Sequence, residues 1–528
     1  MARIRWRIGL VLATVLTLSA PAGVTAHDGL RGELSVGERQ QLLRYARDTW
    51  RSFAAMVDPG TGLPADNIDA DLEPASRSRY TSPTNIGSYI WSTLAARDLG
   101  IITPAEARER VAKALASAVK LERHEPSGQF YNWYDPVTLA KLTVWPTNGD
   151  PVYPFLSSVD NGWFAASLMM IERAIPQLRD EAATILADMD FSCYYDPNAR
   201  SWQGFPAGLI RGGFWPETPP WGPWLPKGNY CGKGPDVTFT GHHYGAFNTE
   251  PRIASYVGIV LGQIPPEHYF AGWRTFDPTC DWSWQEMQPV GEVRTYEVSG
   301  KMLPVFEGAY TYRGMRIVPS WGGSMFEALM PTLLVPEEEW GSRSWGINHP
   351  LYVRAHIEHG LEEAGYGYWG FSPASDPTVA GGYREYGVDP LGLWDGGYTS
   401  DVERTTVDYG FGECRPPLPQ PASYGQGVVT PHAAFLALPY APHEALENLA
   451  NIEADFAAYG DGGFHDSINV ATGQTAARHL SLDQGMIMAA IGNALRNDRI
   501  RDYFSQGAVE GSLRPLMAME VFGAGPAD

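Results

Sequence analysis

Apolar and polar positions along the chain follow two different helical patterns. Six segments are apolar nearly all the way round a helix and rich in small residues, at 84–100, 159–175, 249–262, 324–334, 430–440 and 482–495. Other segments are amphipathic with one charged face, at 36–56, 103–122 and 442–459. Helices that are apolar on every side belong inside a fold, whereas helices with one charged face cover its outside.

The alternation of these two patterns predicts an all-α protein. Six inner and six outer helices in alternation form an (α/α)6 toroid, a six-hairpin barrel with long loops. Two of the outer helices are hard to recognise behind long loops, and a two-layer helical solenoid is the structural alternative. No linker or shift in composition divides residues 36–524, so we expect one large domain over residues 27–528.

Polar residues stand at the starts of the six predicted inner helices. In a toroid every inner helix points the same end at one face, so these residues would surround a single depression. Most of the carboxylates among them, taken singly, are explained as well by N-capping or by the helix dipole. The six residues are Asp160, Glu250, Glu327, Asp483, Asn85 and His432.

Two of these carboxylates are unusual for their surroundings. Glu250 immediately precedes Pro251 at the start of a segment bound for the core, and Thr249 is the expected N-cap. Glu327 is flanked by Phe326 and Leu329, where an unpaired carboxylate is costly to bury. We therefore expect Glu327 to have a partner or a chemical role.

Aromatic residues are abundant in Gly/Pro-rich polar stretches such as 214–224 and 366–373. Flat apolar rings with polar neighbours suit the faces of sugar rings, although ordinary loop packing explains them equally well. The side chains expected to bind sugar are the rings of Trp163, Tyr244, Trp321 and Trp369 and the polar groups of Asn85, His432 and Asp483.

Carboxylates beside aromatic rings are typical of sites that cleave glycosidic bonds. Cleavage needs an acid that protonates the departing oxygen and a carboxylate that acts as base or nucleophile. Asp and Glu supply both when their environments separate their pKa values. We expect Glu250 to be the general acid, Glu327 to be the second carboxylate, and Asp160 to position water or substrate.

Other chemistries find less support in the sequence. There is no phosphate-binding GxxxxGK[ST], no GxGxxG between a strand and a helix, and no GxSxG elbow. His242 and His243 in "GHHYG" could ligate a metal, but adjacent histidines without a third ligand more often form loop hydrogen bonds. We therefore expect no metal and no cofactor.

The start of the chain has the features of a signal peptide over residues 1–26. Three arginines precede an apolar run, and small residues stand at 24–26. We expect export to the periplasm or the medium, with no later membrane span. The formal net charge of −21 makes nucleic acid and anionic membranes poor partners. The oligomeric state stays open, with a monomer as the default.

The cysteine content fits an oxidising compartment. The four cysteines show no metal-ligand spacing, and an even number in an exported protein favours disulfides. Three pairings of Cys193, Cys231, Cys280 and Cys414 are possible, and a Cys193–Cys231 link would close a Trp/Pro-rich loop.

Several segments, in order, resemble the glucoamylase-like domain of bacterial β-1,2-glucanases (glycoside hydrolase family 144 and relatives) and of cyclic β-1,2-glucan synthases. The resemblance covers roughly residues 80–490 and rests on "SPTNIGSYIWSTLAARDLG", "SSVDNGWFAASL", "YGAFNTEPRIASYVGIVLGQIPPEHYF", "SWGGSMFEALMPTLL" and "GGFHDSIN", with "WGINHPLY" and "GVVTPHAAFLAL" as further blocks. It implies an (α/α)6 barrel that hydrolyses or transglycosylates glucans without a metal.

The same resemblance implies roles for individual residues. Glu250 stands in the block that carries a catalytic glutamate, and Glu327 stands in the block that carries the second essential carboxylate of the synthase-like members. Asp160 matches an acidic position of the site. This chain has "NTEPR" where Ser-Glu-Ala-Arg is commoner, and the segments 193–235 and 372–427 resemble insertions beside the pocket.

Together these observations predict an exported glycoside hydrolase that acts on a polysaccharide or oligosaccharide. The expected activity is endo-cleavage of β-1,2-glucan. One alternative is the same fold acting on another extracellular or envelope polysaccharide. The other alternative is a secreted glycan-binding protein with an inactive site.

Overall fold

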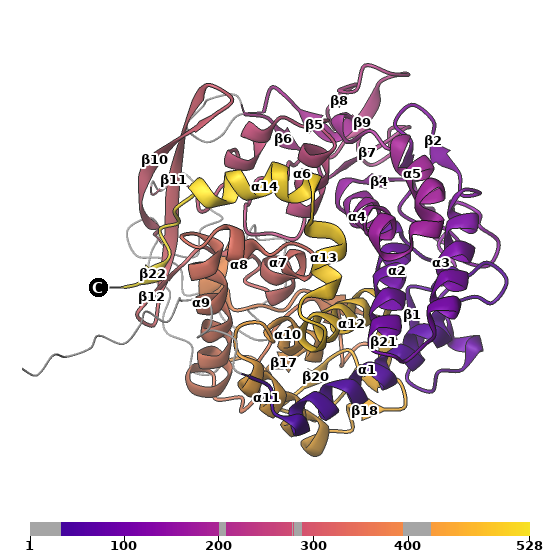
Figure 1. Cartoon of the computed structure of the whole chain (residues 1–528), viewed down its shortest axis with the longest axis vertical. Helices are drawn as coiled ribbons and strands as arrows, with labels where there is room; N and C mark the ends of the chain where they lie inside the picture. Colours follow the sequence, from indigo (N-terminus) through magenta and orange to yellow (C-terminus); the bar gives the residue numbers. More distant parts are fainter. Residues whose placement is uncertain (1–32, 200–206, 277, 279–287, 394–423, 528) are drawn as a thin grey trace, which may run out of the picture.

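A computed structural model describes residues 33–527 except 200–206, 277, 279–287 and 394–423. Its helices form a closed ring around a central axis (Figure 1). The predicted signal peptide lies outside the described residues. Among the described residues, no helix is both long enough and apolar enough to cross a membrane.

Six helices line the inside of the ring, as the sequence predicts. Neighbours pack against each other in the order α12, α2, α4 and α6, and then α7, α10 and α12 again. The gap between α6 and α7 is bridged by Arg252, whose guanidinium donates to backbone oxygens of α7. The inner helices are α2 (Pro83–Asp98), α4 (Ser158–Ala174), α6 (Arg252–Val260), α7 (Met325–Leu329), α10 (Pro431–Leu436) and α12 (Ser481–Leu495).

In the described part of the chain, five helices and the C-terminal segment cover the outside. The helices are α1 (Val36–Met56), α3 (Pro104–Ala118), α5 (Arg179–Ala187), α9 (Trp345–Glu358) and α11 (Pro442–Asp455). Among the described residues that follow α6, the outer position holds the 3-10 helix Pro266–Phe270, and α14 (Ala508–Met519) packs against α6 (Figure 1). The short helices α8 (Glu337–Trp340) and α13 (Arg499–Ser505) complete the ring. The (α/α)6 toroid predicted from the sequence is confirmed.

Small residues let the inner helices approach closely. A Cβ placed on Gly162 of α4 would lie 2.8 Å from the Cα of Ala254 in α6, closer than real Cβ atoms come to backbone. Only glycine therefore fits at this crossing. This contact explains why the predicted inner helices are rich in Gly and Ala.

Two four-stranded antiparallel sheets extend from the ring. One has the order β10 (Val290–Val298), β11 (Lys301–Tyr312), β12 (Met315–Ile317) and β22 (Gly525–Pro526), with Val290 opposite Ala309. The other has the order β4 (Leu156–Ser157), β7 (Gly213–Trp215), β9 (Val237–Phe239) and β8 (Lys227–Gly228). Cys193 and Cys231 form a disulfide, which confirms one of the possible pairings. Cys280 and Cys414 lie outside the described residues.

Short two-stranded ladders shape the loops at the ends of the helices. All are antiparallel except β13 with β16. They are β1 (Asn67–Asp69) with β21 (Arg478–Leu480), β2 (Arg123–His124) with β3 (Gln129–Phe130), β5 (Tyr195–Asp196) with β6 (Leu209–Ile210), β13 (Ser320–Trp321) with β16 (Gly392–Leu393), β14 (Ala374–Ser375) with β15 (Tyr383–Arg384), β17 (Val428–Val429) with β20 (Ile468–Asn469), and β18 (Tyr459–Gly460) with β19 (Gly463–Phe464).

Candidate active site

Serine caps place three of the predicted polar residues in the same position of the first turn. Ser82, Ser157 and Ser324 each accept a hydrogen bond from the backbone N–H three residues later. Those later residues are Asn85, Asp160 and Glu327. A serine N-cap satisfies one of the open N–H groups at a helix start, so the local sequence alone fixes where these side chains leave the helix.

Glu250 is positioned without a serine cap. Helix α6 begins at Arg252, and its N-cap position is Pro251, which has no side-chain cap. The expectation that Thr249 caps this helix is wrong, because the Thr249 hydroxyl donates to the Ala246 carbonyl oxygen at 3.0 Å. Glu250 therefore stands in the turn before the helix.

The two predicted catalytic glutamates meet at the junction of α6 and α7. The backbone N–H of Glu250 donates to Oε2 of Glu327 at 2.9 Å, and both residues are less than a tenth exposed. The indole N–H of Trp163 donates to Oε1 of Glu250 at 2.8 Å. Each carboxyl group thus has a hydrogen-bond donor that fixes its orientation.

Asp160 stands on the adjacent helix α4. Its Oδ1 accepts a hydrogen bond from the Thr84 hydroxyl at 2.7 Å. Asp160 and Glu250 line one wall of the same cavity, together with Asn85. Three of the six helix-start residues, Asn85, Asp160 and Glu250, therefore line one cavity, and Glu327 contacts Glu250 directly.

The cavity next to Glu250 has a volume of about 980 Å³. Three rings in its wall contact one another, with centroids 4.7 to 5.5 Å apart: Tyr80, Trp133 and Trp145. None of the three was predicted as a site residue. For Trp133 a signal was present in "YNWYDP" at 131–136, an aromatic loop with polar neighbours, but the loop is not near the start of an inner helix.

A second cavity, of about 310 Å³, lies on the Glu327 side. Tyr244 and Trp321 line it as predicted, and Trp273 joins them. Trp163 and Trp369 instead lie in the core, 0% and 2% exposed. Their ring faces are covered by protein, so the expectation that they stack on sugar is wrong.

The "GHHYG" loop borders this second cavity. Nε2 of His243 lies 3.0 Å from Oδ2 of Asp196, which also pairs with Arg211 at 3.2 Å. His243 is therefore a hydrogen-bonding loop residue, as the sequence favours.

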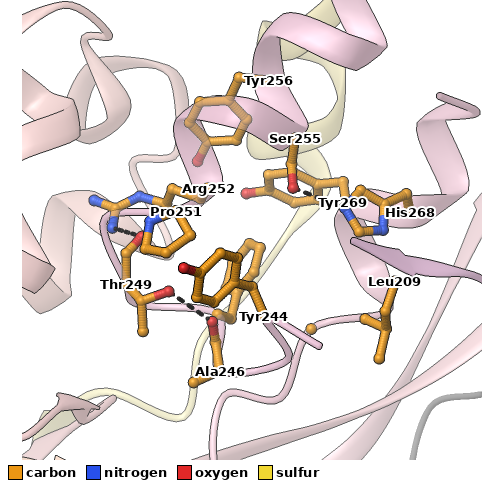
Figure 2. Close-up of a pocket in the computed structure, with 12 residues that line it drawn as sticks. Leu209, Tyr244, Ala246, Thr249, Pro251, Arg252, Ser255, Tyr256, His268 and Tyr269 are labelled. Atoms are coloured by element: carbon orange, nitrogen blue, oxygen red, sulfur yellow. Dashed lines mark hydrogen bonds between the residues drawn. The ribbon is translucent and has the colours of Figure 1, made fainter. Parts of the chain in front are cut away.

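A water-sized cavity of about 30 Å³ lies behind Tyr244 and Pro251 (Figure 2). Ser255 and His268 meet in its wall, with 2.7 Å between Oγ and Nε2. Burial lowers the pKa of His268 to about 4, so this imidazole is neutral. The cavity is too small for a sugar, and the Ser255–His268 pair joins α6 to the 3-10 helix Pro266–Phe270.

A buried arginine fixes the geometry of the two glutamates. Arg252 donates to the carbonyl oxygens of Thr249, Glu327 and Ala328 at 2.8, 3.1 and 2.7 Å. Its guanidinium also pairs with both carboxylate oxygens of Glu337 at 2.7 and 2.8 Å. Burial alone would raise the pKa of Glu337, but the charge and hydrogen bonds of Arg252 lower it to about 2. The pair is therefore fully ionised.

Three carboxyl groups of the site, Glu250, Glu327 and Asp160, have pKa values above their usual ranges. Burial, then the negative charge of Glu327, raises the pKa of Glu250 well above its usual range. Burial raises the pKa of Glu327 to about 7, against the hydrogen bond from Glu250 and the charge of Arg252. Burial also raises the pKa of Asp160. Since the two glutamates repel each other when ionised, the pair favours one proton over none.

A further carboxyl group, which the sequence analysis did not single out, lies within electrostatic reach of Glu327. Burial and the charge of Glu327 raise the pKa of Glu385 to about 8. The remaining predicted residues are separate from the Glu250–Glu327 pair. His432 and Asp483 are buried and contact Asp466, and these three form a group that could hold a metal ion.

Two family models and several solved structures are similar to this chain. Residues 302–508 match the family model described as "Putative glucoamylase". Residues 44–196 match a family model of a protein of unknown function, DUF3131. The "Putative glucoamylase" match covers less than half of the chain. Together with the toroid, it confirms the expected resemblance to glucoamylase-like domains.

One curated relative and two solved structures are similar to this chain along most of its length. The chain is 23% identical to the cyclic β-(1,2)-glucan synthase NdvB of Rhizobium meliloti (strain 1021), over 94% of this chain but only 19% of that protein. An endo-β-1,2-glucanase from Chitinophaga pinensis, solved with sophorotriose and glucose, has a TM-score of 0.59 at 15% identity, over 92% of this chain and 98% of that one. A β-1,2-glucanase from Parabacteroides distasonis has a TM-score of 0.63 at 17% identity, over 92% and 61%.

Proposed function

We propose that this chain is a glycoside hydrolase that cleaves β-1,2-glucan internally, with Glu250 and Glu327 as its catalytic pair. The observation that carries the proposal is the contact between Glu250, which lines the 980 Å³ cavity, and Glu327, which lines the 310 Å³ cavity. A site between two cavities accommodates sugar on both sides of the bond that breaks. The solved neighbours that act on β-1,2-glucan support the choice of substrate.

The electrostatics support two different roles. Because the charge of Glu327 adds to burial in raising the pKa of Glu250, Glu250 keeps its proton and donates it to the glycosidic oxygen as the C–O bond breaks. Glu327 loses its proton first and acts as the anionic partner, either by activating water or by attacking the sugar carbon. Asp160 holds water or a sugar hydroxyl at the cavity wall.

We also propose that the protein is exported. The Cys193–Cys231 disulfide supports an oxidising compartment, and the N-terminal pattern of charged and apolar residues supports a signal peptide.

Glycan digestion tests the catalytic proposal. Purified residues 27–528 and the Glu250→Gln variant are incubated with β-1,2-, β-1,3-, β-1,4- and α-1,4-glucans, and products are followed by reducing-end assay and chromatography. We expect short oligosaccharides from β-1,2-glucan only. Since Glu250→Gln removes the general acid without changing its size, it should lower kcat by about 10²–10⁴-fold.

The matched control is Glu292→Gln, the same change on the exposed strand β10, which should leave kcat unchanged. An active Glu250→Gln enzyme would contradict the assignment of the acid. Activity on a different glucan would overturn the substrate and leave the site in place. Binding without any new reducing ends would favour a glycan-binding protein.

The anomeric form of the first product, read by NMR, separates the two roles of Glu327. Retention of configuration means that Glu327 attacks the sugar, and inversion means that it activates water.

A further inference from the structure

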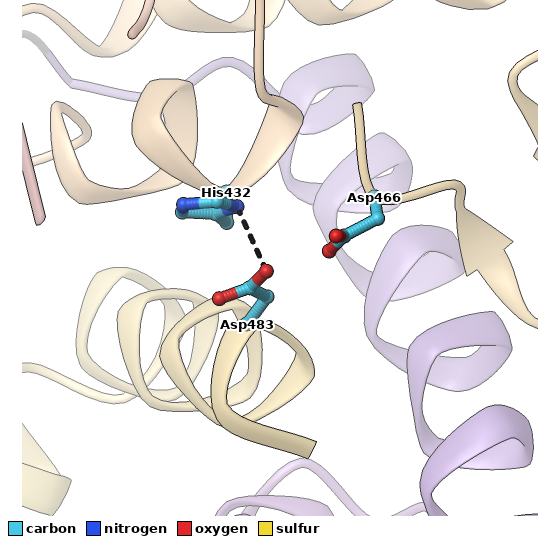
Figure 3. A group of neighbouring side chains, drawn as sticks. All are labelled: His432, Asp466 and Asp483. Atoms are coloured by element: carbon cyan, nitrogen blue, oxygen red, sulfur yellow. Dashed lines mark ion pairs between the residues drawn. The ribbon is translucent and has the colours of Figure 1, made fainter. Parts of the chain in front are cut away.

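A second cluster of ionisable side chains lies apart from the catalytic pair. His432 stands at the start of α10, Asp483 stands at the start of α12, and Asp466 stands in the loop before β20 (Figure 3). One ligand atom from each of the three lies within 4.8 Å of the others. All three side chains are at most 2% exposed.

The cluster contains more polar atoms than hydrogen-bond partners. No hydrogen bond reaches either ring nitrogen of His432, and its nearest carboxylate oxygen is Oδ2 of Asp483 at 3.5 Å. Oδ1 of Asp466 and Oδ2 of Asp483 also lack a hydrogen-bond donor. Buried polar atoms of this kind are costly unless a partner satisfies them. In Figure 3 the imidazole faces Asp483, and Asp466 points to the same space.

We propose that His432, Asp466 and Asp483 bind one divalent cation. One imidazole and two carboxylates form a mixed nitrogen and oxygen ligand set, which suits Zn²⁺ or Mn²⁺ better than the all-oxygen preference of Ca²⁺. Two ligand atoms at about 2.1 Å from one ion lie about 3.4 Å apart at a tetrahedral angle. The 3.5 Å between His432 and Asp483 fits this spacing.

Charge around the cluster favours a cation. The carboxylate of Asp66 lies close enough to repel Asp483, and so does Asp466. Two like charges buried side by side are unfavourable without a counter-ion or a shared proton. A shared proton would relieve the two aspartates but would leave both ring nitrogens of His432 without a partner, whereas a cation would bind one ring nitrogen as well as both carboxylates.

The position of the cluster suggests what the ion does. The backbone N–H of Ser375 donates to Oδ2 of Asp466 at 2.6 Å, and Ser375 lines the 980 Å³ cavity. Leu482, next to Asp483, lines the same cavity. An ion bound here would join two inner helices and one loop directly behind the cavity wall. The ion would hold α10, α12 and the loop before β20 together behind the 980 Å³ cavity. This structural role does not depend on whether the chain hydrolyses glucan.

Metal binding to the full chain tests the proposal. Purified residues 27–528 are treated with a chelator, dialysed and titrated with Zn²⁺, Mn²⁺ and Ca²⁺ by calorimetry. We expect about one equivalent of Zn²⁺ or Mn²⁺ to bind, and the thermal midpoint to rise with the concentration of metal. Asp483→Asn should weaken binding by about 100-fold or more, because the loss of outer-shell partners alone costs about 10–100-fold.

The matched control is His443→Gln. His443 pairs with Glu38 at 2.6 Å on the surface and has no third ligand, so its loss should not change the cluster's affinity for metal. Equal affinity in the Asp483→Asn variant and the wild type would overturn the proposal. So would a wild-type chain that binds none of the three metals, in which case Asp466 and Asp483 share a proton. If Asp483→Asn does not fold, anomalous diffraction from wild-type crystals soaked in Zn²⁺ decides whether an ion occupies the cluster.

Discussion

At the scale of single residues, the site depends on two glutamates that share one environment. Glu250 and Glu327 are both buried, both carry raised pKa values, and one hydrogen bond connects them. The sequence predicts both residues, because a carboxylate at the start of an apolar helix needs a partner. It could not predict that they contact each other, since they lie 77 residues apart.

The raised pKa of Glu327 predicts the acid limb of the pH profile. The active form carries a proton on Glu250 and none on Glu327. As the pH falls through about 7, Glu327 becomes protonated and kcat/KM should fall by about tenfold per pH unit. Initial rates between pH 4.5 and 9 measure this limb.

Trp163→Phe provides a second measurement at the same site. It removes the N–H donor that lowers the pKa of Glu250, so the alkaline limb should move to higher pH while the acid limb stays. An acid limb below pH 5 in the wild type would contradict the raised pKa of Glu327.

Aromatic residues show the limit of sequence analysis at this scale. Trp163 and Trp369 were expected on the cavity wall and lie in the core, whereas Trp133 and Trp145 were not expected there and lie on it. All four belong to local sequences with glycine or polar neighbours. Exposure of a ring is decided by the elements that pack against it, and the local sequence does not contain that information.

At the scale of elements, short motifs position the site. Serine N-caps on α2, α4 and α7 bring the third residue of each helix to one end of the ring. Glu250 precedes its helix, and the Arg252 network fixes that turn against α7. The caps are local and readable from sequence. The network is not, because Glu337 lies 85 residues from Arg252.

Breaking this network should destabilise the fold and the site together. Glu337→Ala leaves the Arg252 charge buried without its carboxylate partner, and loss of one partner of a buried pair costs about 3–5 kcal/mol. Urea denaturation measures the loss, and kcat should fall as well because Arg252 holds the backbone of Thr249 and Glu327.

The control for this variant is Glu358→Ala. Glu358 pairs with Arg313 and Arg354, whose side chains are 34% and 68% exposed, so its loss should cost about 1 kcal/mol or less per pair. Equal losses in the free energy of unfolding would show that the buried Arg252–Glu337 pair stabilises the fold no more than the exposed pairs of Glu358.

At the scale of the whole molecule, the ring closes with help from distant segments. The outer position after α6 is covered by α14 from the end of the chain, and β22 joins the sheet of β10 to β12. In the sequence, two of the outer helices are hard to recognise behind long loops, and no local pattern shows that α14 covers α6. Local periodicity predicts a helix, but it does not predict which gap that helix fills.

The disulfide adds covalent support to a long loop at this scale. It closes a loop with a sequence separation of 38 between Cys193 and Cys231. Replacing both cysteines with serine should lower the free energy of unfolding by about 2–4 kcal/mol, mainly by freeing the unfolded chain. Thermal midpoints of the double variant and of the wild type in reductant measure the effect. If the double variant matches the untreated wild type, the link contributes nothing to stability.

The sequence by itself determined the six inner helices, three of the outer helices and the polar residues at the helix starts, because helical periodicity and capping are local properties. Only the tertiary structure decided that Glu250 contacts Glu327, which rings face the cavities, and that His432, Asp466 and Asp483 gather behind the cavity wall. These contacts join residues far apart in the chain. They exist only once the ring has closed and burial has fixed which side chains lose contact with water.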